Sequence, residues 1–433
     1  MTQNPNRLLK AILPCILAIG IQSLSAQTPS DTVRFSTKQA ESIFLQNNLQ
    51  LLAEKLNISQ ADAKILQAKT WPNPNFSMGD IQLWNKESTD ESPPLFGNFW
   101  RNRTFSAQLE QLVQTAGKRK KNIRLETRNK EQAETALTDM LQALKAEFRQ
   151  TAAELLYLQR VQDDLSYQYE EVSTLLRAQQ AQNREGNISQ TELYRIKALA
   201  VSLHAEVNEL NEQLTEKQKN LKTLMALDPK ANIILTDTLG ATVAGPWRTL
   251  SIDELIALGV KQNASIRMAR NDVKISEAQL AIERANRVPD VSLNINYDRN
   301  GNNQLNFWGA GFAMDLPFFN RNKGNIRAAQ LEVQKTGLLE KSRTAEVSNS
   351  VVKTWQDLNR SISLYESIDK DYIDKLSLLT KGVIKNFLQR NMSLLEFLDF
   401  FESFRNSREK YYEAVRNIST KKEDLNYLTG SDF

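Results

Sequence analysis

Cysteine and histidine are almost absent from this chain of 433 residues, which contains one of each, Cys15 and His204. Cys15 lies in an N-terminal segment with the pattern of a secretory signal, so the processed chain would have no thiol for a disulfide bond or a thiolate metal site. His204 has no cysteine or second histidine near it, which predicts an ordinary helix-surface residue. The sequence therefore predicts no metal-binding site.

Glycine and proline are also scarce, with fifteen and eleven residues. Their scarcity favours long uninterrupted helices over a globular fold with many strands. The chain has no apolar run of the roughly 20 residues that a membrane-spanning helix needs, and its mean hydropathy is -0.48. No transmembrane helix is expected.

The net charge argues against a nucleic-acid-binding protein, and the absence of catalytic motifs argues against an enzyme. The formal net charge of +4 is too small to indicate a nucleic-acid partner. The sequence contains no phosphate-binding loop, zinc-protease motif, dinucleotide fingerprint or nucleophile elbow. We therefore expect no catalytic residue, no cofactor and no enzyme activity.

Residues 1–26 resemble a secretory signal peptide. Two basic residues precede the short apolar stretch 11–21, and small residues end the segment, which predicts a mature chain that begins at Gln27. Lipidation of Cys15 is the alternative, and Pro14 disfavours it because a small residue is wanted before the cysteine.

The chain contains an internal repeat. The segment from Phe35 matches the segment from Leu250 without a gap, and later residues match at a slightly smaller offset, so the first half has the longer insertion, between Ser77 and Leu112. The matched pairs include Asn48 and Asn263, Pro74 and Pro289, Ile188 and Met392, Ser189 and Ser393, and Glu192 and Glu396. We expect a first repeat over 27–239 and a second over 240–433.

Each repeat begins with a predicted capping box, Ser36 with Gln39 and Ser251 with Glu254, followed by a helix of about 20 to 35 residues that stops before a proline. Alternating apolar and polar residues then predict two strands joined by a polar loop. The expected hairpin strands are about 75–84 and 103–113 in the first repeat, and about 290–298 and 305–317 in the second.

After each hairpin the apolar spacing changes to alternating steps of three and four residues, which predicts coiled-coil helices. The expected long helices are about 117–184 and 189–227, and then about 322–389 and 393–428. At 1.5 Å per residue the first of them would be about 100 Å long, the scale of a periplasmic rod.

Two hairpins supply four strands, which cannot close into a cylinder in lipid. Three copies would supply twelve, an ordinary number for a membrane barrel. Four tryptophans in or beside the hairpins, Trp71, Trp84, Trp100 and Trp308, suit an aromatic girdle at the membrane surface. A water-exposed sheet packed against helices is the alternative.

Four motifs, in this order, are similar to those of the TolC-like family of outer-membrane efflux proteins: 111–119, the turn 186–189, the stretch 315–324 and the turn 391–393. The resemblance covers the mature chain. It implies a mainly α fold with a small membrane β part, and a homotrimer with a 12-stranded β-barrel in the outer membrane on a 12-helix periplasmic α-barrel. It also implies a periplasmic adaptor and an inner-membrane pump as partners, and passive export of drugs or metal cations.

The resemblance also implies roles for residues at the two turns between long helices, which we call the tips. The expected adaptor-binding residues are Gly186, Asn187, Ile188, Ser189, Asn391, Met392 and Ser393. Glu396 and Asp399, together with Glu192, are the expected acidic ring at the periplasmic entrance, where confined carboxylates would attract cations. Solvated helix charges are the alternative.

Phe387 and Met392 stand where the family has a tyrosine and an arginine that help to lock the entrance, and neither can make those bonds. Closure would then depend on packing, or on Arg390 reaching Glu192 or Glu396. The basic run 118–121 predicts either a contact with lipid phosphates or neighbouring protomers, or a solvated face. The alternatives for the whole chain are a periplasmic coiled-coil adaptor without a pore, and a duct for type I protein secretion.

Overall fold

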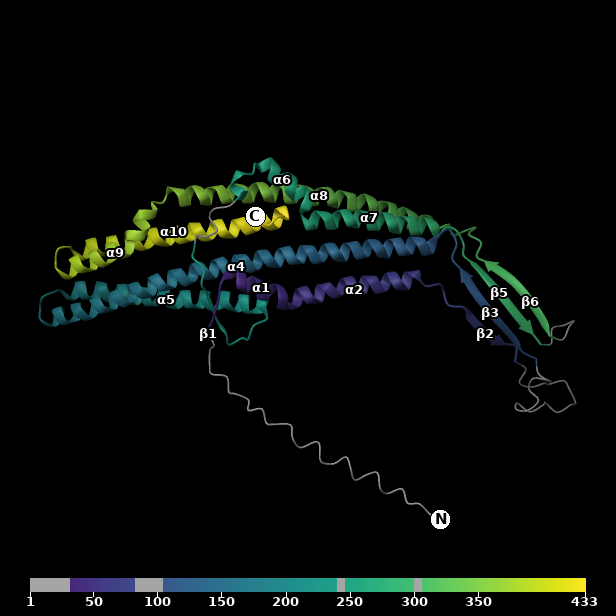
Figure 1. The fold of residues 1–433 in the computed structure, drawn as a ribbon, viewed down its shortest axis with the longest axis horizontal. Coiled ribbons are helices and arrows are strands. Elements are labelled where there is room, and N and C mark those ends of the chain that lie inside the picture. The colour runs from purple at the N-terminus through teal and green to yellow at the C-terminus, as the bar shows by residue number, and fades with distance from the viewer. Residues whose placement is uncertain (1–31, 82–103, 240–245, 300–305) are drawn as a thin grey trace, which may run out of the picture.

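The computed structural model describes residues 32–81, 104–239, 246–299 and 306–433. Long helices lie side by side along one axis, with a small sheet at one end and the two helical tips at the other (Figure 1). No helix in the described ranges combines the length and the apolar character needed to cross a membrane.

The helices follow the order of the repeat. The first repeat contains α1 (Thr37–Asn47), α2 (Leu49–Lys69), α4 (Lys118–Arg184) and α5 (Gln190–Met225); the second contains α6 (Ile252–Gln262), α7 (Ala264–Ala285), α8 (Lys323–Ser367), α9 (Lys370–Leu388) and α10 (Leu394–Thr429), after a 3-10 turn at Pro246–Thr249. Capping boxes begin α1, α5, α6 and α10 at Ser36, Ser189, Ser251 and Ser393. The matching positions of the two repeats thus form matching helix starts.

Three expected helices are interrupted. The opening helix of each repeat divides at an asparagine, Asn48 or Asn263, whose side-chain oxygen caps the next helix. The helix expected over 322–389 divides between α8 and α9, where Ile368 is extended and the Asp369 carboxylate accepts a hydrogen bond from the Asp371 backbone N–H at 2.9 Å. Apolar spacing continues across these points, which is why a periodicity argument does not detect them.

The two asparagines also join helices end to end. The Asn48 amide donates to the Leu224 carbonyl oxygen at 2.9 Å, and the Asn263 amide donates to the Leu428 carbonyl oxygen at 3.1 Å. Both asparagines are buried, with 3% and 2% of their surface exposed. As a result α2 continues the line of α5, and α7 continues the line of α10, alongside the longer helices α4 and α8 (Figure 1).

The main apolar core follows α4 where α4 packs against α5 and α10. Phe148 and Leu155 of α4 and Leu203 of α5 are fully buried, and Phe148 stacks on Phe44 of α1 at 5.1 Å between ring centres. These residues occupy apolar positions of the three-four spacing, or they pack against residues that do. The coiled-coil interpretation of this helix pair is therefore correct.

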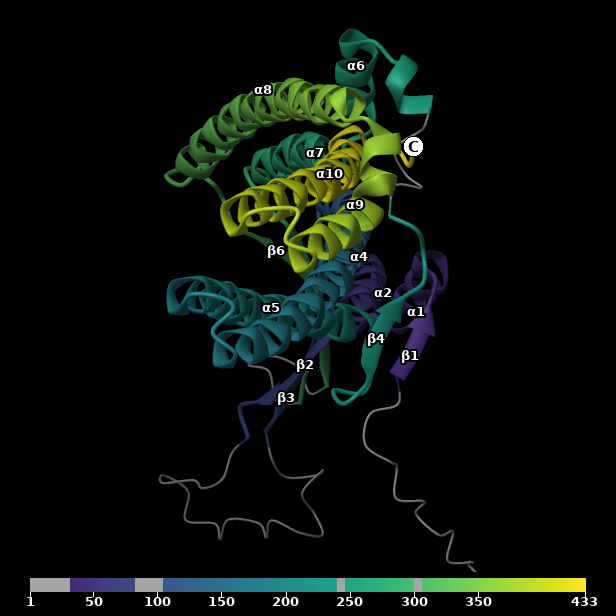
Figure 2. The ribbon, with the colours of Figure 1, turned by 90° about the vertical axis from the view of Figure 1, so that its left-hand side faces the viewer.

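A small parallel pair of strands, β1 (Thr32–Phe35) and β4 (Asn232–Leu235), lies at mid-length of the rod (Figure 1) and to one side of the helices (Figure 2). It was not predicted, because each strand is only four residues long. The Thr37 hydroxyl donates to the Asp237 carboxylate at 2.6 Å, which ties the end of β4 to the start of α1.

The sheet contains β2 (Asn75–Gly79), β3 (Ser106–Val113), β5 (Val291–Asp298) and β6 (Phe307–Met314), all antiparallel in the order β2-β3-β5-β6. The two hairpins meet through β3 and β5, which pair over eight residues. Strands β3, β5 and β6 begin and end within a few residues of the expected bounds, whereas β2 ends at Gly79 and the expected residues 82–84 lie outside the described residues. Trp84 and Trp100, two of the four girdle tryptophans, lie outside the described residues.

Candidate functional site at the sheet and the helical tips

The sheet has one apolar and one polar face. Side chains directly opposite one another in antiparallel strands share a face, so the register places Phe76, Leu109, Ile295 and Ala310 in one row and Ser77, Gln108, Asn296 and Gly309 in the next. The apolar face is exposed: Phe76, Ile295 and Phe312 have 66%, 53% and 70% of their surface accessible. No described element covers these side chains.

The polar face carries amides and hydroxyls. Asn294 and Asn296 of β5 lie opposite Gly311 and Gly309 of β6. A Cβ atom at Gly309 would come within 2.5 Å of the Asn296 side-chain oxygen, and one at Gly311 within 2.8 Å of the Asn294 oxygen. The glycines therefore leave room for the asparagine side chains to lie along the sheet, a constraint that strand patterns do not reveal.

Both outer strands have a free edge within the part of the chain that the structure describes, because β2 pairs only with β3 and β6 only with β5. An exposed apolar face and two open edges do not suit a sheet in water, since the edge N–H and C=O groups invite pairing with another chain. The expected alternative of a sheet packed against helices is wrong in that respect, because the helices meet the sheet at one end and do not cover its apolar face.

The basic run at the start of α4 makes contacts within its own chain. The Lys118 ammonium group lies 2.8 Å from the Asp290 carboxylate and donates to the Val288 carbonyl oxygen. The Arg119 guanidinium donates to the Lys69 carbonyl oxygen at 3.0 Å and lies over the Trp71 ring. These two cations therefore join the start of α4 to the segment before β5 and to the end of α2, and their contact with lipid phosphates or neighbouring protomers stays a prediction.

The first tip is closed by a left-handed glycine. Gly186 has φ +76°, its N–H donates to the Asn183 carbonyl oxygen, and the Asn187 N–H donates to the Gln182 carbonyl oxygen at 2.9 Å. These are the two bonds of a Schellman helix end. The Ile188 carbonyl oxygen accepts the Asn183 amide at 3.0 Å, which holds the turn against α4.

The second tip has the same geometry without glycine. Arg390 adopts φ +60° at the position that matches Gly186, and the Asn391 N–H donates to the Asn386 carbonyl oxygen at 3.0 Å. The Arg390 guanidinium donates to the Asn187 carbonyl oxygen of the first tip at 3.4 Å. A contact of Arg390 with Glu192 or Glu396 was one of the two expected alternatives for closure; within this protomer Arg390 joins the two tips through a backbone oxygen.

Aromatic packing occurs where the family lock was expected. Phe387 stacks on Phe397, with ring centres 4.9 Å apart, and Phe397 contacts Phe401 at 5.7 Å. Phe397 is fully buried, and Met392 packs against the same core cluster. This agrees with a tip held by packing. The sequence placed Phe387 at this point, and the structure supplies its stacking partner, Phe397.

The carboxylates expected in the acidic ring lie on the helices that follow the tips. Glu396 and Glu192 are the third residues of α10 and α5 and accept hydrogen bonds from the backbone N–H groups of Ser393 and Ser189. The bonds from Ser393 lower the pKa of Glu396 below its usual value. Asp399 is exposed one helical turn further along α10.

In the described residues, no group of three or more His, Cys, Asp or Glu side chains is arranged to hold a metal ion. His204 is exposed on α5 and stacks on Tyr169 at 5.1 Å between ring centres. Its surroundings are those of a helix-surface residue.

Known proteins resemble this chain in sequence and in fold. The family described as Outer membrane efflux protein matches residues 42–227. The cobalt-zinc-cadmium resistance protein CzcC of Cupriavidus metallidurans is 24% identical over 299 residues, which cover 68% of this chain and 66%, just under two thirds, of the relative. The names of the family and of this relative describe efflux and resistance, and neither describes an enzyme.

Two crystal structures of low sequence identity share the fold. CusC, from a study of transmembrane channel formation, aligns with TM-score 0.73 and 17% identity over 95% of this chain and 96% of that chain. The outer membrane protein VceC of Vibrio cholerae aligns with TM-score 0.67 and 16% identity over 92% and 96%. The fold is therefore that of the mainly helical outer-membrane channel proteins, as the sequence motifs predicted. In residues 42–227 the chain is therefore similar to the outer membrane efflux proteins, and its fold is that of the solved channels.

Proposed function

We propose that this protein is the outer-membrane duct of an efflux system, a passive conduit through which an inner-membrane pump and a periplasmic adaptor export their cargo. The observation that carries the proposal is the two-faced sheet with open edges at the end of a long helical rod. An apolar outer face and a polar inner face are what a membrane barrel requires. The rod has the length to cross the periplasm.

Closure follows from the strand order. Since β2 and β6 run in opposite directions, β6 of one copy can pair antiparallel with β2 of the next, and a ring of copies removes every free edge. The homotrimer, with twelve strands, is the assembly that we propose. Head-to-tail contacts of this kind give a closed ring when the rotations between successive copies add up to one full turn.

The test of this function uses the full-length protein. Outer-membrane fractions should contain it as a detergent-extractable trimer, and the purified trimer should give stepwise ion conductance in planar lipid bilayers. A heat-denatured sample serves as the control. A water-soluble monomer that gives no conductance would favour a periplasmic adaptor and overturn the proposal.

For the cargo we propose metal cations, supported by the likeness to a cobalt-zinc-cadmium resistance protein. The acidic ring at the periplasmic entrance would consist of Glu396, Asp399 and Glu192. In the trimer, the carboxylates of three copies would add to one negative electrostatic potential that attracts cations. Because the pKa of Glu396 is lowered, its carboxylate stays charged from neutral pH to below the usual glutamate value of about 4.3.

Neutralising the ring should weaken cation selectivity. Glu396→Gln with Asp399→Asn removes two of the three ring charges of each copy and leaves that of Glu192, and glutamine can still serve in the capping box. We expect the reversal potential in a salt gradient to move toward the unselective value at neutral pH, and the wild type to lose selectivity only as the pH falls below about 4.3. Asp253→Asn, on α6 at mid-length, is the matched control. Unchanged reversal potentials in the double variant would exclude the ring.

For the adaptor contact we propose the two tips, with Ile188 and Met392 as the apolar centres of each turn. Both side chains are half-buried and lie at matching positions of the repeat. Ile188→Glu with Met392→Glu should abolish export in cells, because a charge at an apolar contact must be desolvated, while the purified trimer still conducts. Full export by this variant would show that the adaptor binds elsewhere.

A further inference from the structure

The junction between the sheet and the rod collects positive charge. Four segments connect the strands to the helices: 69–74, 114–124, 284–290 and 315–327. They contain eleven lysine and arginine residues but only two acidic residues, Asp290 and Asp315, whereas the whole chain has 55 basic and 51 acidic residues. We call these four segments the basic band.

The band lies at one end of the sheet. The register pairs Val113 of β3 with Val291 of β5, and Val291 with Met314 of β6. The three segments next to these residues therefore lie at the same end of the sheet. Strand β2 runs antiparallel to β3, so its first residue, Asn75, faces the same way as the end of β3. All four strands therefore enter or leave the rod through the band.

Most cations of the band have no carboxylate partner. Within the described residues, the band contains one ion pair, between Lys118 and Asp290. The Lys121 ammonium, which also belongs to the band, donates to the Ala116 carbonyl oxygen. Arg287, Arg321 and Lys323 are exposed and form no ion pair with any described residue. Their charges are left for a ligand or for solvent.

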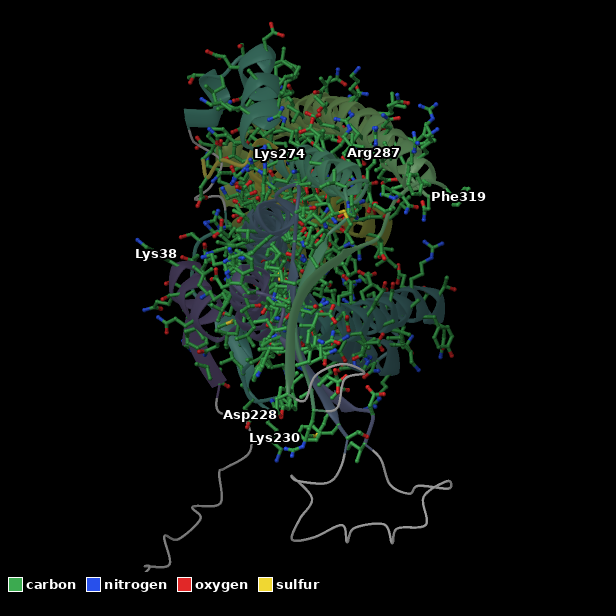
Figure 3. The ribbon with its side chains drawn as sticks, turned by 90° about the vertical axis from the view of Figure 1, so that its right-hand side faces the viewer. Lys38, Asp228, Lys230, Lys274, Arg287 and Phe319 are labelled. Carbon is green, nitrogen blue, oxygen red and sulfur yellow. The ribbon has the colours of Figure 1, made fainter. Side chains whose placement is uncertain are left out.

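Aromatic side chains accompany these cations. Phe318 and Trp71 have 67% and 59% of their surface exposed, and Phe319 is fully exposed. Phe319 projects beyond the ribbon in the same part of the molecule as Arg287 (Figure 3). Along the strand direction the surface thus changes from an apolar sheet face to aromatic and basic residues, the order expected where a membrane meets water.

In the proposed ring, the band of a neighbouring copy would not neutralise this band. A ring of identical copies places the same four segments at the same height in each protomer, so every neighbour also contributes an excess of cations. Lipid phosphates next to a membrane-embedded surface are the anions at this height, and each basic residue near such a surface adds about fivefold to binding.

We infer that the basic band binds the phosphate groups of phospholipid headgroups in the leaflet nearest the rod. Arg287, Arg321 and Lys323 would supply the charge, and the aromatic side chains would lie at headgroup depth. This inference rests on the proposed function, because it needs the sheet to be in the membrane. In this role, the band would fix how deeply the trimer lies in the membrane.

The test is native mass spectrometry of the full-length trimer with phosphatidylglycerol. The triple variant Arg287→Gln, Arg321→Gln, Lys323→Gln should bind the lipid on the order of a hundredfold more weakly, from about fivefold for each cation. The control is Lys38→Gln, Lys230→Gln, Lys341→Gln, which also removes three exposed cations; Figure 3 shows Lys38 and Lys230 well away from Arg287. Its lipid binding should equal that of the wild type.

Competition with inorganic phosphate separates the two sources of the anion. Displacement of the lipid by inorganic phosphate, with the same loss in the triple variant, would identify a free-phosphate site and overturn the lipid assignment. Equal lipid binding by the triple variant and the wild type would also overturn it. Conductance is measured on the same samples: a conducting trimer with unchanged lipid binding refutes this inference alone, whereas a protein that neither assembles nor conducts refutes the proposed function.

Discussion

At the scale of single residues, the two tips form the same turn with different side chains. Gly186 and Arg390 both have left-handed backbone conformations, at φ +76° and +60°. A left-handed residue with a Cβ costs about 1–2 kcal/mol, and glycine avoids that cost. The second tip therefore carries backbone strain that the first does not. The Arg390 contact with Asn187 across the tips offsets part of it.

Exchanging these residues should have opposite effects. Gly186→Ala should destabilise the first tip by about 1 kcal/mol, whereas Arg390→Gly should leave the second tip as stable as before or slightly more stable. No atom lies within 4 Å of a Cβ built on Gly186, so the alanine effect would be purely conformational. Hydrogen exchange of the amides of residues 182–188 and 386–392 measures both effects.

Arg390→Ala is the control for this comparison, because it keeps the backbone cost and removes the guanidinium. Faster exchange at both tips in Arg390→Ala would show that the bridge to Asn187 joins them. Equal exchange in Gly186→Ala and the wild type would show that the left-handed turn is not a source of strain.

At the scale of elements, the rod is built from shorter helices stacked end to end beside longer ones. Each joint depends on one buried asparagine that serves two helices: its oxygen caps the helix that follows, and its amide satisfies a carbonyl group at the end of another. Those carbonyl groups have no partner within their own helices. The joints therefore remove a penalty that would fall in the middle of the rod.

Removing either asparagine should destabilise the rod. Asn48→Ala and Asn263→Ala each lose a helix cap and leave a buried carbonyl group unpaired, a combined cost of about 1–3 kcal/mol. Thermal unfolding followed by circular dichroism should show a lower Tm for both. Asn57→Ala, on the exposed side of α2, is the control. A Tm equal to that of the control would mean that water satisfies the freed carbonyl groups.

At the scale of the whole molecule, the two flanks of the protomer are complementary in their exposed apolar residues. Helix α2, which leads into β2, exposes Leu56 and Leu66; helix α8, which follows β6, exposes Leu331 and Leu338. Pairing β6 of one copy with β2 of the next would bring these two helices together. The same contact that closes the sheet would bury both sets of leucines.

Cysteine cross-linking should detect this seam. The sequence has no cysteine after Cys15, so Trp71→Cys with Leu316→Cys introduces defined sites at the rod ends of β2 and β6. A flexible bismaleimide should give covalent dimers and trimers and nothing larger, because the ring closes. Each single variant should give no cross-linked trimer. Species larger than trimers would indicate an open or larger assembly.

The amino-acid sequence by itself determined the features that come from local patterns: the repeat, the capping boxes at Ser36 and Ser251, the alternating strands, the coiled-coil helices and the likeness to the efflux proteins. The capping boxes at Ser189 and Ser393 were not predicted. Only the tertiary structure decided how distant segments meet. It placed the Asn48 and Asn263 amides on carbonyl groups from the ends of other helices, directed Arg390 to Asn187, and stacked Phe387 on Phe397. The reason is physical, because helical and strand periods report which face of an element is apolar, whereas end-to-end joints and cross-tip bonds depend on where the chain returns in space.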